Sequence, residues 1–235
     1  MTINLAPALR GLGLCALAAA LTTLLNTIAP LFYSASDFDG RMALIGNPFY
    51  VARQWVLLIH PAVTLLLALG LALALFERCT GRASAGLIFA GVEKMTEFVL
   101  GFLIIAVVNP VWKAGYLAAS DPAVAPQLRL QLDLFGEIIG GLVYLLWTMF
   151  ILSTALFALA LDRHRGGIET LLFWSAAVAI GITVIMFFGD LFSLGWTAPV
   201  VSWLYPPAMT AHRLLAGLWL LGRARELRHA SCVGC

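Results

Sequence analysis

Long apolar stretches alternate with short polar segments along this chain. A helix needs about 20 mostly apolar residues to cross the hydrocarbon core of a bilayer. Six stretches reach that length, at residues 8–32, 51–76, 84–108, 130–161, 170–194 and 200–221. The strict alternation of a membrane β-barrel strand is absent. The pattern therefore predicts an all-α, polytopic membrane helical bundle with six transmembrane helices.

The composition supports this assignment and excludes several other classes. Of the 235 residues, 62% are hydrophobic and 11% are charged, and the mean hydropathy is +0.96. Soluble domains are closer to half apolar and a quarter charged. The formal net charge is only +2, so the chain lacks the basic field that nucleic-acid binding requires. A disordered chain and a disulfide-rich scaffold are also excluded.

Basic residues set the expected orientation, because they hold short loops on the cytoplasmic side. One side carries Arg10, Arg78, Arg82, Arg163, Arg165, Arg223, Arg225 and Arg228, and the other carries Arg41, Arg53, Lys113 and Arg129. Both termini are therefore expected in the cytoplasm. The chain divides into a transmembrane domain at residues 1–222 and a cytoplasmic tail at residues 223–235. The longer outer connections are expected at residues 33–50 and 109–129.

The tail ends in a pair of cysteines, Cys232 and Cys235, with C-x-x-C spacing. A zinc site would need a second pair of ligands, and a thioredoxin motif would need a different helical setting. We expect a disordered end without function, with reversible acylation or metal capture as the alternatives. Since no cysteine reaches the predicted oxidising face, we expect no structural disulfide.

Three ionisable residues lie close together inside the third apolar stretch. They are Glu93, Lys94 and Glu97, and each would cost about 2.5 to 3.5 kcal/mol at the centre of a lipid-exposed helix. Helical spacing places both carboxylates on one stripe with small residues, so this face should point into the bundle. Two interpretations stay open: an ion pair that only fixes packing, or a working site.

Other polar residues fall inside the predicted helices at several depths. His60 and His212 are expected near the middle with Glu97, whereas Glu137 and Asp190 lie toward the outside. The predicted intramembrane binding site consists of Glu93, Lys94, Glu97, His60, His212, Glu137 and Asp190. We predict no metal and no cofactor. Haem or another metal, held by His60 and His212, is the alternative, because two imidazoles at equal depth suit axial ligation.

Two short motifs carry a resemblance. The third predicted helix contains Lys94-Met-Thr-Glu97 followed by Phe-Val-Leu-Gly-Phe-Leu-Ile, and the sixth ends in Ala216-Gly-Leu-Trp-Leu-Leu-Gly. In these motifs and in its topology the chain resembles a group of uncharacterised six-helix bacterial integral membrane proteins, a domain of unknown function. That group usually has Arg at the position of Lys94 and often has Glu in the last helix, where His212 and Arg213 stand here. The resemblance implies a multi-pass protein of the bacterial inner membrane and no particular activity.

These observations favour a protein that binds or translocates a small solute or protons through a polar intramembrane site. Two alternatives remain: a structural or accessory subunit of a membrane complex, or an intramembrane enzyme in which Glu97 or Glu137 acts on a lipid or isoprenoid substrate. The chain contains no H-E-x-x-H, G-x-S-x-G or nucleotide-loop motif, so whether it is an enzyme stays open. The expected partners are the lipid bilayer, a small molecule or proton, and another membrane protein, with no nucleic acid.

Overall fold

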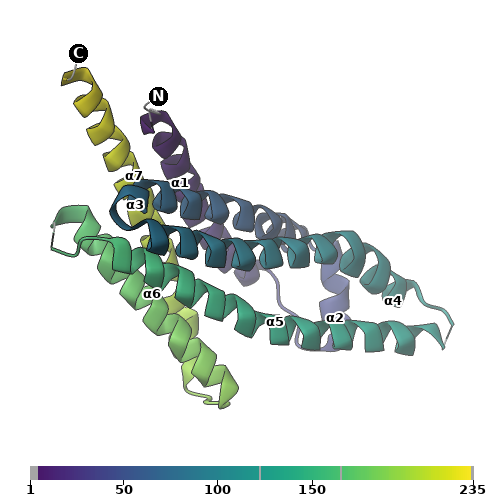
Figure 1. The fold of residues 1–235 in the computed structure, drawn as a ribbon. Coiled ribbons are helices and arrows are strands. Elements are labelled where there is room, and N and C mark those ends of the chain that lie inside the picture. The colour runs from purple at the N-terminus through teal and green to yellow at the C-terminus, as the bar shows by residue number, and fades with distance from the viewer. Residues whose placement is uncertain (1–4, 122, 165, 234–235) are drawn as a thin grey trace.

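The computed structural model describes residues 5–121, 123–164 and 166–233, and all regular structure in these ranges is helical (Figure 1). The α-helices are α1 (Ala6–Ile28), α2 (Phe38–Ala43), α3 (Pro48–Leu103), α4 (Ala114–Ala118), α5 (Val124–Ala160), α6 (Gly167–Leu191) and α7 (Thr197–Val233). Short 3-10 helices η1 (Ala29–Phe32) and η2 (Leu44–Gly46) flank α2, and a π-helix, η3 (Ile104–Lys113), joins α3 to α4.

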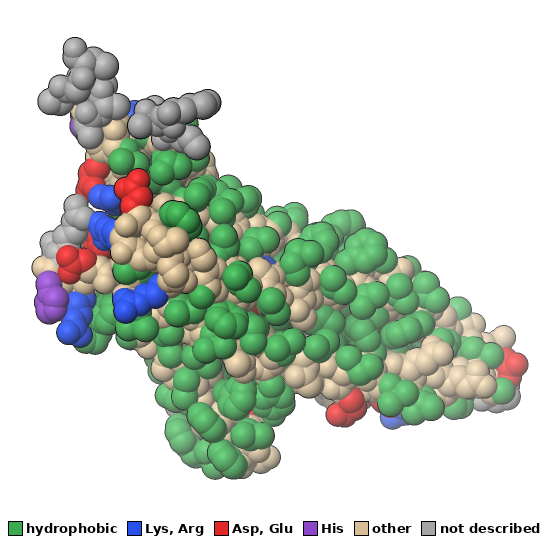
Figure 2. All heavy atoms as spheres, in the orientation of Figure 1, with side chains coloured by type: hydrophobic (Ala, Val, Ile, Leu, Met, Phe, Trp, Pro, Cys, Tyr) green, Lys and Arg blue, Asp and Glu red, His purple; other side chains and the backbone are tan. Residues whose placement is uncertain are grey.

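Four helical segments in the described residues are long and apolar enough to cross a membrane. They are Ala6–Phe32, Pro48–Ala118, Val124–Ala160 and Gly167–Leu191. Their outward faces remain apolar, and Figure 2 shows hydrophobic side chains over the flanks of the molecule. The predicted class, an all-α protein with several helices able to span a membrane, is thereby confirmed.

Helix α3 is a hairpin rather than one straight rod. At Cys79 the backbone leaves the helical region, with φ −148° and ψ 66°, and the chain folds back on itself (Figure 1). The two arms lie side by side, because a Cβ on Gly101 would lie 3.5 Å from the Cα of Leu58. A single non-helical residue, Cys79, therefore joins the arms 48–78 and 80–103.

The helices also extend further than the hydropathy pattern indicates at the opposite end. The expected outer loop at residues 109–129 is mostly helical, since η3 and α4 continue the second arm of α3 and α5 begins at Val124. Pro110 lies inside η3, and the wider turn of a π-helix takes up the distortion that a proline causes in an α-helix. The Asp121 carboxylate accepts a hydrogen bond from the Ala123 backbone N–H at 2.8 Å just before α5 begins.

Small residues allow close contacts in the bundle. Helix α1 packs against α7 and α3, α5 packs against α3 and α6, and α6 packs against α7. Where α1 crosses α7, a Cβ on Gly217 would lie 3.1 Å from the carbonyl oxygen of Gly13. Such glycines let two backbones approach in the way that membrane helices require. Leu75, Leu172 and Leu220 fill the core beside this crossing.

The predicted cytoplasmic tail is helical at residues 223–233, because α7 continues to Val233. The disordered end expected at residues 232–235 was therefore wrong for the backbone of residues 232–233. Arg223 and Glu226 form an ion pair within this extension, and such pairs at i,i+3 support a helix. The Cys232 side chain and Cys235 lie outside what the structure describes. The start of α1 and the end of α7 lie at the same end of the molecule (Figure 1).

Candidate functional site

A cavity of about 450 Å³ lies between α1, both arms of α3, α5, α6 and α7. One part of its wall is polar and comes mainly from α1, α3 and α7. The polar lining residues are Thr23, Asn26, Thr27, Arg53, His60, Glu93, Lys94, Glu97, Thr183, Tyr205 and Arg213. The other part is apolar and includes Val143, Leu146, Trp147 and Phe150 of α5. The cavity is thus amphipathic and lies inside a bundle whose outer surface is apolar.

The second arm of α3 supplies the ion cluster that the sequence predicts as a site. The Lys94 ammonium lies 2.5 Å from the Glu93 carboxylate and 3.0 Å from the Glu97 carboxylate. Glu93 and Lys94 are buried, whereas 26% of the Glu97 side chain is exposed. One cation therefore serves two carboxylates, and Glu97 is the more accessible of the two.

Helix α7 brings a further buried cation, Arg213, to the same cavity. Its residue is 8% exposed, and its guanidinium donates a hydrogen bond to the Thr23 hydroxyl of α1. In the described ranges no carboxylate oxygen lies within 4.0 Å of this guanidinium. Arg213 thus differs from Lys94, which has two carboxylate partners.

His60, on the first arm of α3, lines the cavity and is held by α1. Its Nδ1 lies 2.7 Å from the Thr22 hydroxyl oxygen, and that hydroxyl donates to the Ala19 carbonyl at 3.0 Å. When the Thr22 hydroxyl donates its single hydrogen to Ala19, Nδ1 of His60 carries the proton that bonds to Thr22. In that tautomer of the neutral ring, Nε2 is unprotonated and can accept a hydrogen bond.

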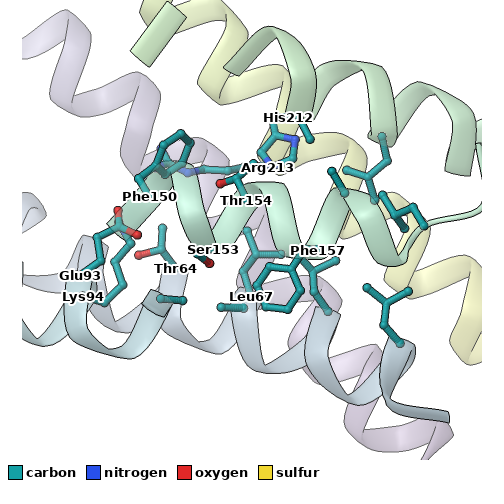
Figure 3. A pocket seen from close by; sticks show the side chains of 18 residues that line it. Thr64, Leu67, Glu93, Lys94, Phe150, Ser153, Thr154, Phe157, His212 and Arg213 are labelled. Atoms are coloured by element: carbon teal, nitrogen blue, oxygen red, sulfur yellow. The ribbon is translucent and has the colours of Figure 1, made fainter. Parts of the chain in front are cut away.

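His212 lines a different, smaller cavity of about 60 Å³, which shares Glu93, Lys94, Phe150 and Arg213 with the large one (Figure 3). Its Nδ1 lies 3.0 Å from the Ser175 hydroxyl, which donates to the Leu172 carbonyl at 2.8 Å. The two histidines considered as axial haem ligands therefore line separate cavities, each held by its own hydroxyl. Among the described residues, no three His, Cys, Asp or Glu side chains are grouped closely enough to hold a metal ion.

The two remaining predicted residues lie elsewhere. Glu137 is exposed on α5 and lines a separate cavity of about 480 Å³ beside α2 and η3. Asp190 is exposed near the end of α6, where it accepts a hydrogen bond from the Tyr144 hydroxyl at 2.6 Å. The structure thus brings Glu93, Lys94, Glu97 and His60 together, places His212 in the adjoining cavity, and separates Glu137 and Asp190 from all of them.

Sequence reasoning did not assign Arg213, Arg53, Asn26, Thr23 or Tyr205 to the site. A signal existed for Arg213, because an arginine inside an apolar stretch is as costly as Lys94. The polar residues of α1 gave a weaker signal, since neutral side chains are common in membrane helices. The Arg53 guanidinium donates a hydrogen bond to the backbone carbonyl of Asn26 at 3.3 Å and another to the Tyr33 hydroxyl at 3.2 Å.

A second buried carboxylate, Glu169, lies in the first turn of α6 away from these residues. One of its oxygens accepts from Arg78 at 2.5 Å and from the Asp162 backbone N–H at 2.9 Å. The other accepts from the Trp219 indole N–H at 3.3 Å. Its hydrogen-bonding capacity is therefore met by side chains and backbone of α3, α7 and the α5–α6 connection.

The fold and the cavity define a class: a helical membrane bundle with an amphipathic, charge-lined interior cavity. Comparisons with protein-family models, curated proteins and solved structures give no match to this chain. Its function is therefore inferred from the cavity.

Proposed function

We propose that this chain is a multi-pass protein of the bacterial inner membrane that binds or translocates a small solute or protons through the amphipathic cavity. The single observation that carries the proposal is that buried ionisable groups from both arms of α3 and from α7 line a hollow of about 450 Å³. Ionisable groups are costly within a membrane and are retained mainly where they face partners or a functional pathway. The volume falls within the range of small-molecule sites.

The proposed topology has six transmembrane helices and both termini in the cytoplasm. The break at Cys79 supports counting α3 as two spanning segments, and α7 supports a sixth because it packs against α1 and α6. Arginines and lysines gather at the end of the molecule where α5 meets α6 and where the chain ends lie (Figure 2). This asymmetry supports a cytoplasmic location for that end.

Glu97 is the residue proposed to exchange protons. It shares Lys94 with Glu93, so one of the two carboxylates can accept a proton without leaving the ammonium unpaired. Glu97 is the more exposed of the pair and lines the cavity. A carboxylate with these properties can couple the arrival of a proton to a change in the charge of the cavity.

The test is proton flux in proteoliposomes that contain the purified full-length chain and a pH-sensitive dye. A panel of small solutes, namely a monocarboxylate, an amino acid, a sugar and an amine, is added outside. We expect at least one solute to drive proton movement with the wild type, and Glu97→Gln to abolish this flux while its unfolding temperature stays near the wild-type value.

Glu137→Gln is the matched control, because it makes the same change at a carboxylate outside the cavity. It should retain the wild-type flux. Normal solute-driven flux in Glu97→Gln would contradict the role of Glu97. A wild type that moves no proton and takes up no solute of the panel would contradict translocation.

A further inference from the structure

We propose that the solute of this cavity is an organic monocarboxylate, held through its carboxylate by Arg213 and through an apolar body by α5. This inference rests on the proposed function, since it names the chemical class that the amphipathic cavity would take. It draws on four features: an unbalanced charge, a guanidinium with unused donors, a buried acceptor without a partner, and an apolar part of the wall on α5.

The charges that line the cavity do not balance. Three cationic side chains, Arg53, Lys94 and Arg213, face two carboxylates, Glu93 and Glu97. Both carboxylates contact Lys94, so neither arginine has an acidic partner within 4.0 Å among the residues described. One positive charge is in excess, and a monoanion would neutralise it.

Arg213 is the group best placed to receive that anion. Its guanidinium is buried and has one hydrogen-bond acceptor, the Thr23 hydroxyl, in the described part of the chain. A guanidinium presents several N–H donors in a planar fork, which matches the two oxygens of a carboxylate. The remaining donors of Arg213 would be satisfied by such a bidentate contact, which compensates the cost of burying the charge.

A further polar atom of the wall also lacks a partner. Asn26 lies one helical turn from Thr23 on α1, and its Oδ1 is buried without a hydrogen bond to any described residue. An unpaired buried acceptor is costly. A hydroxyl or N–H on the bound solute would satisfy it.

The apolar part of the wall limits what the rest of the solute can be. Val143, Leu146, Trp147 and Phe150 of α5 line the cavity, and aromatic and branched apolar side chains bind an apolar surface rather than a second charge. An inorganic anion would leave this wall without a partner. A carboxylate with a short aliphatic or aromatic body would cover both walls at once.

The test is equilibrium binding to the purified chain in detergent, measured by calorimetry, with four small probes. Benzoate carries the carboxylate and the apolar body, benzamide removes the charge, benzylamine reverses it, and inorganic phosphate keeps an anion without an apolar body. We expect benzoate to bind at least about tenfold more tightly than the other three. Equal binding of benzoate and benzamide would overturn the proposal.

Variants locate the site. Arg213→Gln should weaken benzoate binding about 10- to 100-fold, the effect of losing a charge-assisted hydrogen-bonded pair. Arg213→Lys should bind with intermediate affinity, because it keeps the charge and loses the fork. Val143→Trp should also weaken binding, because it fills the cavity and leaves every charge in place. Glu137→Gln is the control, since Glu137 is exposed and lies outside this cavity, and it should change affinity less than about threefold.

Arg213→Lys and Val143→Trp keep the test decisive if Arg213→Gln does not fold. Unchanged benzoate affinity in both would overturn the proposal. A long-chain fatty acid supplied in the micelle tests where the carboxylate comes from. If its binding also depends on Arg213 and exceeds that of benzoate, the carboxylate site stands and its ligand enters from the bilayer.

Different results would contradict the proposed translocation and the proposed carboxylate site. Benzoate binding that depends on Arg213, without solute-driven proton flux in proteoliposomes, would leave the carboxylate site and remove translocation. Proton-coupled uptake of an amine or a sugar that persists in Arg213→Gln would leave translocation and remove the carboxylate site.

Discussion

Two buried charged groups in this bundle, Glu169 and Arg213, have opposite surroundings. Glu169 is 4% exposed and accepts hydrogen bonds from Arg78, the Asp162 backbone and Trp219. Arg213 is 8% exposed and lies against a cavity, with the Thr23 hydroxyl as its acceptor in the described residues. The two residues are buried to a similar extent, but Glu169 makes more hydrogen bonds than Arg213 does.

The difference separates a structural charge from a binding charge. A buried ion stabilises a fold only when its hydrogen bonds are complete, because leaving water carries a large desolvation cost. Glu169 meets that condition with groups of the protein itself. Arg213 does not, and the proposed carboxylate would supply the hydrogen bonds that the described residues leave unmade. The Glu93–Lys94–Glu97 cluster lies between these extremes, since its ion pairs are complete but it lines the cavity.

The largest expected effect comes from Lys94→Met. It leaves the Glu93 and Glu97 carboxylates without the cation that both contact. Breaking a buried ion pair from one side costs about 3–5 kcal/mol. We expect a loss of that size in the free energy of unfolding, measured by denaturant titration in mixed micelles.

The double variant Lys94→Met with Glu93→Gln provides the control, because it removes one carboxylate together with its cation. It should recover part of the lost stability. If Lys94→Met unfolds like the wild type, the Glu93–Lys94–Glu97 cluster contributes nothing to the stability of the fold. The cluster would then not lie between Glu169 and Arg213 in its structural role.

A somewhat smaller effect on stability is expected from Glu169→Gln. The substitution keeps the volume but removes the charge that Arg78 contacts, and its amide group meets N–H donors of Asp162 or Trp219. Loss of hydrogen bonds to a buried charge predicts a decrease of about 2–4 kcal/mol in the free energy of unfolding. Solute-driven proton flux per folded molecule should stay at the wild-type value.

The result for Glu169→Gln is best read beside that for Glu97→Gln. The same chemical change is made at two carboxylates, and the expected outcomes are reversed: stability falls at Glu169 and flux falls at Glu97. If Glu169→Gln abolishes flux without a loss of stability, the assignment of Glu169 as a structural charge is wrong.

The sequence predicted the helical membrane class and the inward direction of Glu93 and Glu97 because both follow from local rules. An apolar stretch must satisfy its own backbone as a helix, and helical periodicity places residues on faces. The lengths of the connections between helices were harder to predict from the sequence. Residues 109–129 look like a polar loop, but η3, α4 and α5 convert most of them to helix, since turn-forming residues permit a loop without requiring one.

The sequence could not show which polar side chains meet at one cavity. Depth along a helix follows from residue number, but the rotation and neighbours of each helix depend on packing between helices. The sequence prediction therefore included Asp190 in the site and left Arg213 out. Packing of α7 against α1 turned Arg213 toward Thr23, whereas Asp190 remained exposed.

The smallest expected effect concerns Asp190, which the depth argument placed in the site and the structure places outside the cavity. Asp190→Asn keeps an acceptor for the Tyr144 hydroxyl, and both groups lie at an exposed position. Exposed polar contacts contribute little to stability because water replaces either partner. We therefore expect no resolvable change in the unfolding transition, in benzoate affinity or in solute-driven flux, with Arg213→Gln measured in parallel as the positive control. If Asp190→Asn lowers flux as strongly as Glu97→Gln does, proton transfer extends beyond the cavity. Exposure alone would then not distinguish the ionisable groups that take part in proton transfer from those that do not.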